Sequence, residues 1–365
     1  MAEESNTSVY KYSGKDLPNA TLHLTEINLP EYLQFWYRIT SIYLPILLLS
    51  LGLIGNTLIF LTVHYGKFSK SVAGFHFKAL AIADQFSSLD MVQILLIQAV
   101  PEWIYPWGQF FCKEHLFSSY TSYSVAAWCV VALTVDRFIA ICFPFKAQTL
   151  CTKKKAKIFI FLNIVIHLMI NAPRAAFLEF RYPVELLVIH DICHIVPWVS
   201  PSYEYTQEFF YHAVDVILPC CLVVAANSCI LLKIRRTNKE TSILGNCRPK
   251  ADDGGITAML LTMSFAFVIF MTSWPIDFIY WIVLHPEKTD ENPALRKLIF
   301  SVTIVLVLCN NQFNFYIYIL ASSSFRNDFK RLLRRMCKRQ TSINARLSSG
   351  GKYGSGDGRD RGTSV

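Results

Sequence analysis

The chain has 365 residues, of which 53% are hydrophobic and 17% are charged, and its formal net charge is +9. A soluble protein of this length would form about two or three domains. Here the apolar residues come in long uncharged blocks, which indicates a single membrane domain with several spans. Because the basic residues lie between these blocks, the positive charge does not predict binding to nucleic acid.

Residues 1–38 are polar and are predicted to form an extracellular tail. The tripeptides that begin at Asn6 and Asn19 fit the acceptor pattern for N-glycosylation, so both are candidate glycan sites. The first apolar core, residues 44–63, is longer than the core of a cleavable signal peptide and has no small-residue cleavage site. We therefore interpret it as a helix that inserts by itself.

Seven apolar blocks follow along the chain, and block three shows why they are interpreted as membrane helices. Residues 115–135 contain no charged side chain, and a membrane helix needs roughly 20 apolar residues. The sequence therefore predicts an all-α membrane protein, a bundle of seven transmembrane helices followed by a short amphipathic cytoplasmic helix. The blocks lie at roughly 39–65, 75–100, 110–142, 155–177, 207–235, 256–284 and 295–320.

The orientation of these blocks follows from their flanking charges. Lysine and arginine concentrate in the loops after blocks one, three and five and in the segment after block seven, whereas the alternate loops are rich in acids. The positive-inside rule then predicts a multi-pass plasma-membrane protein with an extracellular N-terminus and a cytoplasmic C-terminus. An odd number of spans requires the same arrangement.

Polar residues and prolines interrupt the apolar blocks. A polar side chain in hydrocarbon is costly and is a functional candidate by default, and a proline removes a helix hydrogen bond and kinks the helix. The prolines are Pro219 in block five and Pro275 in block six. The polar residues that we single out are Asn56 in block one, Asp84 in block two, and Asn310, Asn314 and Tyr318 in block seven.

An amphipathic segment follows block seven, with apolar residues on one face and basic residues on the other. It is predicted to lie as a helix on an anionic bilayer surface. Cys337 at its end is a candidate for palmitoylation. The apolar face consists of Phe325, Phe329, Leu332, Leu333 and Met336, and the basic face of Arg326, Lys330, Arg331, Arg334 and Arg335.

These motifs, in this order and at these membrane faces, resemble the rhodopsin-like family of G-protein-coupled receptors, and within it the receptors for peptides and neuropeptides. Block three ends in Asp136-Arg137-Phe138, similar to the family's Asp-Arg-Tyr, and block seven contains a sequence similar to its Asn-Pro-x-x-Tyr. The resemblance covers residues 39–335, so we treat 1–38 as the tail outside it and 336–365 as a disordered cytoplasmic tail.

The resemblance implies roles for residues at both membrane faces. Asp136 and Arg137, with Pro144 and Phe145 in the next loop, would contact a heterotrimeric G protein, which is activated when the sixth helix moves outward at Pro275. Outside the cell, Cys112 and Cys193 lie in segments where oxidising conditions allow a disulfide, and the family pairs them. Asn56, Asp84, Asn310, Asn314 and Tyr318 would form a polar core that binds a sodium ion, although Ala126 replaces a serine that the family often supplies there.

The resemblance also narrows the ligand. Light receptors need a lysine in block seven, which residues 298–325 lack, and amine receptors need an aspartate where this chain has Ser119. Two acids in a tyrosine-rich cavity would attract a cationic peptide, although Asp215 could instead pair with His212, one helical turn away. The implied ligand residues are Ser119, Tyr120, Tyr123, His212, Asp215, Asp277 and Tyr280.

Three departures from the family pattern keep a second function open. Phe315 replaces the block-seven proline, so that helix is expected to be straighter, and Asn227 replaces a tyrosine. Trp274 is adjacent to Pro275 rather than two residues before it, which gives Ser273 the switch position and turns Trp274 elsewhere. The alternative is therefore a seven-helix receptor with atypical or no G-protein coupling, a scavenger or arrestin-biased receptor.

Other functions lack a pattern in this sequence. We see neither the internal repeat nor the paired broken helices typical of transporters, and the histidines and cysteines form no catalytic or metal-binding constellation. We therefore expect no enzyme and no metal site. In the tail, phosphorylated hydroxyls would bind an arrestin, and Thr363-Ser364-Val365 resembles a C-terminal ligand of PDZ domains.

Overall fold

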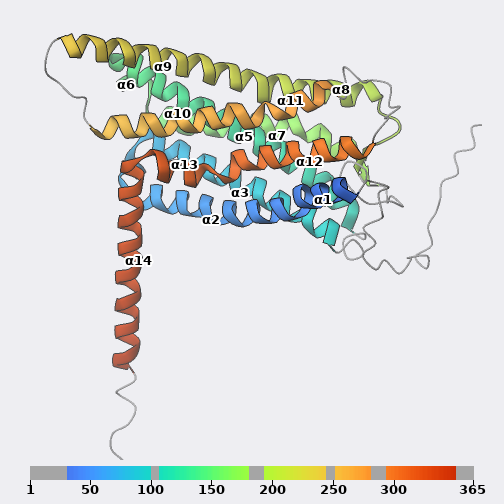
Figure 1. The fold of residues 1–365 in the computed structure, drawn as a ribbon, viewed down its shortest axis with the longest axis horizontal. Helices are drawn as coiled ribbons and strands as arrows, with labels where there is room; N and C mark the ends of the chain where they lie inside the picture. Colours follow the sequence, from blue (N-terminus) through green and yellow to red (C-terminus); the bar gives the residue numbers. More distant parts are fainter. Residues whose placement is uncertain (1–30, 100–106, 181–192, 244–250, 281–292, 351–365) are drawn as a thin grey trace, which may run out of the picture.

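The computed structural model describes residues 31–99, 107–180, 193–243, 251–280 and 293–350 (Figure 1). Its helices run side by side as an elongated bundle, and one last helix runs across their direction. The predicted glycan sites, Asn6 and Asn19, and the PDZ-like end lie outside the described residues.

Seven helical rods make up the bundle, and several of them consist of more than one element. They are α1 (Glu31–Arg38) with a π-helical turn (Ile39–Tyr43) and α2 (Leu44–Tyr65); α3 (Val72–Ala99); α5 (Gly108–Cys142); α7 (Lys153–Ala176); α8 (Pro201–Tyr211) with the π-helical turn η5 (His212–Ile217) and α9 (Leu218–Ile243); α10 (Ala251–Met271) with α11 (Ser273–Phe278); and α12 (Pro293–Gln312) with α13 (Asn314–Ala321). Short elements join them: a 3₁₀ turn (Lys67–Lys70), α6 (Pro144–Leu150), and the antiparallel strands β1 (Leu178–Phe180) and β2 (Cys193–Ile195).

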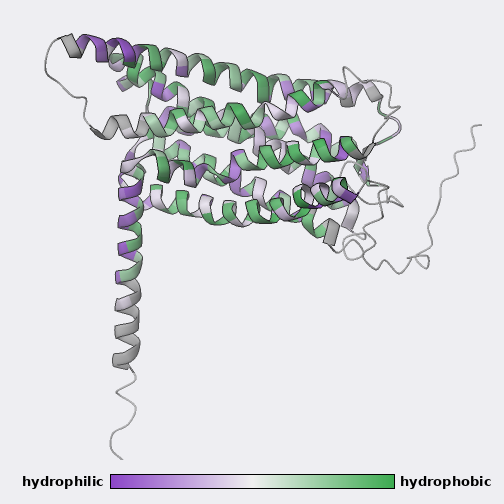
Figure 2. Ribbon diagram, viewed as in Figure 1, coloured by the Kyte–Doolittle hydropathy of each residue, from purple (hydrophilic) through white to green (hydrophobic). Residues whose placement is uncertain are grey.

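Six of these rods are long and apolar enough to cross a membrane within the described part of the chain. The remaining one, α3, packs along both α2 and α5. Hydrophobic residues cover the bundle helices, whereas hydrophilic residues gather at the start of α14 (Ser323–Gly350) and at the end of α9 (Figure 2). The predicted seven-helix bundle is therefore confirmed.

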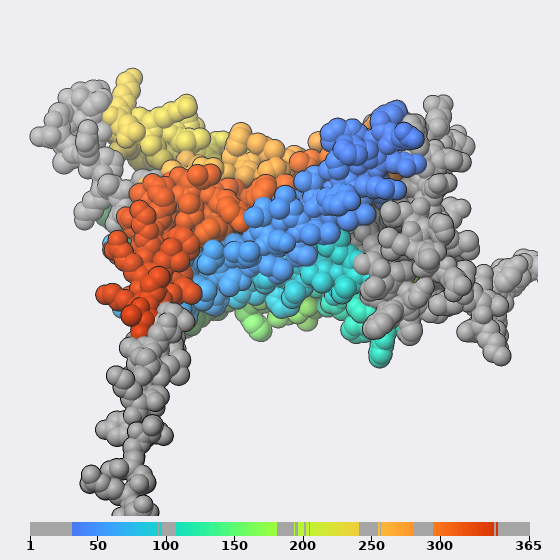
Figure 3. All heavy atoms as spheres, turned by 60° about the horizontal axis from the view of Figure 1, so that its bottom comes forward, coloured from blue at the N-terminus to red at the C-terminus, as the bar shows by residue number. Residues whose placement is uncertain are grey.

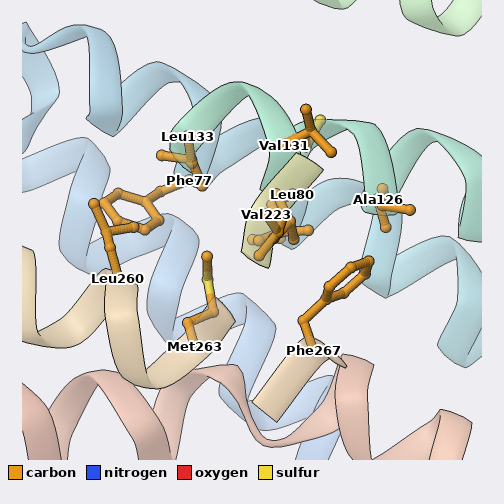
Figure 4. Packing of buried hydrophobic residues seen from close by; sticks show 14 of the residues in the cluster. Phe77, Leu80, Ala126, Val131, Leu133, Val223, Leu260, Met263 and Phe267 are labelled. Atoms are coloured by element: carbon orange, nitrogen blue, oxygen red, sulfur yellow. The ribbon is translucent and has the colours of Figure 1, made fainter. Parts of the chain in front are cut away.

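The core lies where α3, α5, α9 and α10 meet (Figure 4). Phe77, Leu133, Met263 and Phe267 are almost fully buried there. Because lipid tails are as apolar as these side chains, helix association in a membrane depends on close packing rather than on removal of apolar surface from water.

The structure corrects two predicted boundaries. The first helix begins at Glu31 rather than near residue 39, because the intervening stretch continues the helix through a π turn. The helix α14, predicted to be cytoplasmic, does not end near residue 336 but continues to Gly350, so residues 336–350 are helical rather than a disordered tail. No proline and no glycine occurs in that stretch before Gly350, which lets the helix propagate.

A buried carboxylate holds α14 against the bundle. Asp328 accepts hydrogen bonds from the backbone N–H of Lys67 at 2.7 Å and from Arg331 at 3.1 Å. Phe325 and Phe329 pack on Phe315, with ring centroids 6.1 and 5.4 Å apart. These apolar contacts belong to the predicted apolar face, while Cys337 stays exposed.

The seventh rod is not straight, contrary to expectation. α12 ends at Gln312 and α13 begins at Asn314, although Phe315 stands where the family has proline. Asn56 Nδ2 donates to the backbone carbonyl of Asn311 at 3.3 Å, so a side chain from another helix enters the hydrogen-bond ladder just before the break. Such insertion is a known cause of helix interruption.

Gly52 lets this break sit against the first rod. On this face α2 lies along α12 and α13 (Figure 3). A Cβ added at Gly52 would lie 1.3 Å from Gln312 Oε1, so no larger residue fits without displacement of that side chain.

We therefore expect Gly52→Ala to lower the stability of the purified protein by about 1–3 kcal/mol, the usual cost of overpacking. The measurement is the thermal unfolding midpoint in detergent. Ser50→Ala, at an exposed position of the same helix, is the control. An unchanged midpoint for Gly52→Ala would show that Gln312 moves aside at no cost.

Candidate ligand site and coupling site

At one end of the bundle, the antiparallel strand pair β1–β2, called the hairpin below, is fixed to α5 by a disulfide. The structure joins Cys112 to Cys193, the pairing that the family resemblance implies. Gln109 strengthens this attachment, since its Nε2 donates to the carbonyl of Leu178 at 2.9 Å and its Oε1 accepts from the N–H of Phe180 at 2.8 Å. The strands β1 and β2 are therefore held over the end of α5.

Below the hairpin, an aromatic cluster surrounds Trp274. The Trp274 ring lies 6.0 Å from those of Tyr123 and Tyr211, 6.4 Å from that of Tyr120 and 6.3 Å from that of His212. The expectation that Trp274 turns elsewhere is wrong. The sixth rod breaks at Thr272, so α11 starts with a new rotational phase that turns this indole toward the neighbouring helices.

Asp215 is buried and pairs with side chains of two other helices. It is 1% exposed and lies in the π-helical turn η5, with its Oδ1 2.9 Å from His167 Nε2 and 3.2 Å from Trp128 Nε1. Its partner is neither a ligand cation nor His212, the alternative considered from the sequence. Asp215 meets His167 because the π turn directs its side chain toward α7. The spacing of residues in the sequence does not reveal this pairing.

A single proton lies in the contact between His167 Nε2 and the carboxylate of Asp215. His167 Nδ1 lies 2.7 Å from the backbone carbonyl of Asn163, which can only accept, so this nitrogen donates. His167 Nε2 faces the carboxylate, and a proton must lie between them. The pair is therefore neutral overall, which suits its position within the membrane-spanning part.

A second pair, which the sequence did not suggest, lies closer to the hairpin end. Arg174 Nη1 lies 2.5 Å from Glu208 Oε1, and the hydroxyl of Tyr120 donates to the same oxygen at 2.9 Å. The sequence put the start of block five at about residue 207, but α8 begins at Pro201, so Glu208 lies about two turns inside the helix. The sequence did contain a signal for this pair, because Arg174 is a charged residue near the end of the fourth apolar block and needs a partner there.

The other predicted ligand residues divide between two places. Tyr120, Tyr123 and His212 lie in the aromatic cluster, and the Oγ of buried Ser119 is 3.5 Å from His115 Nδ1. Asp277 is half-buried on α11 and Tyr280 is exposed just after it. Phe278 of α11 stacks on His212 at 4.5 Å, which brings this part of the sixth rod against the cluster.

Of the predicted polar core, the structure joins Asp84 and Asn314 directly, while Asn56 and Asn310 each bond to Asn311. Asn314 Nδ2 donates to Asp84 Oδ2 at 2.8 Å, and Asn310 Nδ2 donates to Asn311 Oδ1 at 2.9 Å. Tyr318 is the exception, since its hydroxyl points to Met263 Sδ at 3.1 Å. Asp84 Oδ1 and Asn56 Oδ1 are buried without a hydrogen-bond partner among the described residues. Buried oxygens without donors are the type of ligand that a hard cation takes.

At the opposite end, the Asp-Arg-Phe motif has a partner that the sequence did not reveal. Asp136 Oδ2 lies 3.1 Å from Nε2 of His76, a buried residue of α3. Cys151 donates to the backbone carbonyl of Asp136 at 3.7 Å, and burial raises the pKa of this thiol to about 11, so it remains protonated near pH 7.

The next loop offers an apolar contact at the same end. Pro144 begins α6, a short helix that follows α5 after a single residue. Phe145, the next residue, is 89% exposed. This side chain is therefore open to a partner on the face that carries Asp136 and Arg137.

Comparison with known proteins gives consistent matches. A family model described as "7 transmembrane receptor (rhodopsin family)" matches residues 55–318. The chain is 24% identical to somatostatin receptor type 4 of Rattus norvegicus, over 78% of this chain and 70% of that protein. It is also 24% identical to melatonin receptor type 1A of Phodopus sungorus (82% and 81%) and to the FMRFamide receptor of Drosophila melanogaster (76% and 51%).

If His167 neutralises Asp215, removal of the histidine alone leaves a buried carboxylate without its partner. We expect His167→Leu to destabilise the purified protein by about 3–5 kcal/mol. The double change His167→Leu with Asp215→Leu should cost much less, because no uncompensated charge remains. Thermal unfolding in detergent measures both, with Met169→Leu at an exposed position of α7 as the control. Additive losses in the double variant would contradict the pairing.

Proposed function

Because the chain belongs to the rhodopsin family of seven-transmembrane receptors, we propose that it binds an extracellular peptide and activates heterotrimeric G proteins by outward movement of its sixth helix. In this proposal the hairpin end is extracellular and the end that carries α14 is cytoplasmic, as the loop charges predict. Membership of this family makes the protein a membrane receptor rather than an enzyme.

One observation carries the proposal: the aromatic cluster connects the ligand end directly to the break in the sixth rod. Trp274 lies between Tyr120, Tyr123 and Tyr211 on one side and the Thr272 interruption on the other. A ligand that displaces these rings acts on the segment around Pro275, where the helix can bend. Movement of α10 would then open the opposite end of the bundle.

Sequence and relatives favour a peptide as the ligand. Residues 298–325 contain no lysine for a retinal group, and Ser119 stands where amine receptors have an acid. Two of the relatives carry peptide names, somatostatin and FMRFamide. With Asp215 paired to His167, the acid that we assign to a ligand cation is Asp277 on α11.

Further partners follow as proposals from the same premise. A sodium ion would bind among Asp84, Asn56 and the seventh rod, where it would supply positive charge to oxygens that lack donors. An arrestin would bind the phosphorylated tail, and a PDZ domain would bind Thr363-Ser364-Val365.

The coupling role is tested at Arg137. Its guanidinium can exchange intramolecular contacts for carbonyls of an inserted G-protein helix. We expect Arg137→Ala to abolish ligand-stimulated nucleotide exchange on a purified G protein while surface expression and peptide binding persist. Full exchange activity in that variant would refute the role, and arrestin recruitment without any exchange in the native protein would favour the atypical receptor instead.

The cation contact is tested at Asp277 with a matched ligand pair. The pair is the best arginine-containing peptide from a library screen and its citrulline analogue, which has similar shape but no charge. Asp277→Asn should weaken binding of the arginine peptide by on the order of 2–5 kcal/mol, the usual cost of breaking a desolvated charge pair. Binding of the citrulline analogue should hardly change. Equal losses for the two peptides would assign Asp277 a structural role.

A further inference from the structure

Arg174 holds more hydrogen-bond donors than its neighbours use. Only 11% of its side chain is exposed, and its guanidinium stacks on the ring of Tyr120, 3.7 Å from the centroid. A guanidinium has five N–H groups. Nη1 donates to Glu208 Oε1 and Nη2 to the carbonyl of Gln207 at 3.1 Å, while Nε has no hydrogen-bond partner among the described residues. Unused donors therefore remain beside a well-ordered carboxylate.

Glu208 has a complementary surplus on the acceptor side. Its Oε1 receives both Arg174 and the Tyr120 hydroxyl. Its Oε2 lies 3.9 Å from His212 Nε2, which is beyond hydrogen-bond distance. The side chain is 22% exposed, so Glu208 is not sealed from a ligand, and its Oε2 lies on the side of His212 and the aromatic cluster.

The charges of this pair decide which group it can bind. Arg174 and Glu208 compensate one another, so a free cation would meet the guanidinium and a free carboxylate would meet the glutamate. An uncharged group that both donates and accepts hydrogen bonds can use the spare N–H donors of Arg174 and the spare acceptor oxygen of Glu208 without charge repulsion. Within a peptide, a terminal carboxamide has this chemistry, with a carbonyl oxygen and an NH₂ group on one carbon.

We propose that Arg174 and Glu208 recognise the C-terminal carboxamide of the peptide ligand. Its carbonyl accepts from the Arg174 guanidinium, and its NH₂ donates to Glu208 Oε2. The rings of Tyr120, Tyr211 and Trp274 pack on one another beside this pair, and in the proposal the last side chain of the peptide lies against them. The inference rests on the proposed function, in which the ligand is a peptide, and it names the chemical form that the peptide must have.

The simplest alternative is a structural ion pair that only ties α7 to α8. That role would make all ligands sensitive to substitution in equal measure. Recognition of a carboxamide instead predicts discrimination between two forms of one peptide. Glu208→Gln separates the two, because it removes the charge that repels a terminal carboxylate and keeps the shape of the side chain.

The experiment uses an array of synthetic peptides, each made as a carboxamide and as a free acid, on cells that express the full chain. Calcium and cyclic AMP report activation, and antibody labelling reports surface expression. We expect active peptides to favour the carboxamide by at least about tenfold over the acid, the effect of one lost hydrogen bond to a charged group. Glu208→Gln should narrow this preference by at least about tenfold.

Two further variants keep the test decisive. Arg174→Lys retains the charge but not the planar fork, and it should weaken the amide form more strongly than the acid, whereas a purely structural pair would weaken both forms equally. Glu240→Gln, the same chemical change at an exposed position near the end of α9, at the opposite end of the fifth rod from Glu208, should leave the preference unaltered. If Glu208→Gln fails to reach the surface, the native amide-to-acid ratio and Arg174→Lys still decide.

The outcomes separate the two proposals. Equal responses to acid and amide forms, or a preference that survives Glu208→Gln unchanged, would overturn the carboxamide site and leave the peptide receptor intact. A receptor that reaches the surface and responds to no peptide in either form would overturn the proposed peptide ligand, and the carboxamide site with it.

Discussion

A polar side chain in hydrocarbon must find a partner within the protein, because no water is there to replace one. The bundle meets this constraint by pairing acids across helices. Asp84 accepts from Asn314, Asp215 from His167, and Glu208 from Arg174, so α3, η5 and α8 are connected to α13 and α7. Each connection joins segments distant in sequence, and together they determine which helix faces meet in a core that packs without a hydrophobic driving force.

The fold could be read from the sequence because its main signals are local. Long uncharged blocks identify the helices, and loop charges set their expected orientation. The polar residues inside the apolar blocks could also be identified from the sequence alone. Their partners could not, since a partner depends on the rotation of two helices about their axes. Asp215 shows this, because its position in a π turn directs it to His167 rather than to His212 on its own segment.

Interruptions explain the remaining differences between expectation and structure. The fifth rod contains a π turn before Pro219, the sixth breaks at Thr272 before Pro275, and the seventh breaks at Phe313 without a proline. Each interruption ends one helical element and begins another within the same rod. Trp274 thereby enters the aromatic cluster from a sequence position that suggested otherwise. Transfer of the family pattern failed for Trp274, just after one such break, whereas Asn314, just after another, still meets Asp84 as the pattern implies.

The attachment of α14 determines which nearby positions can be substituted without loss of the contact. Asp328 accepts from a backbone N–H at position 67, and every residue except proline supplies that donor. Substitution of the Lys67 side chain therefore leaves the attachment intact. The constrained position is instead Gly66, where an added Cβ would lie 2.5 Å from Asp328 Oδ2. If this anchor is shared by related chains, we expect glycine at position 66 and aspartate at position 328 to be retained, while the residue at position 67 varies.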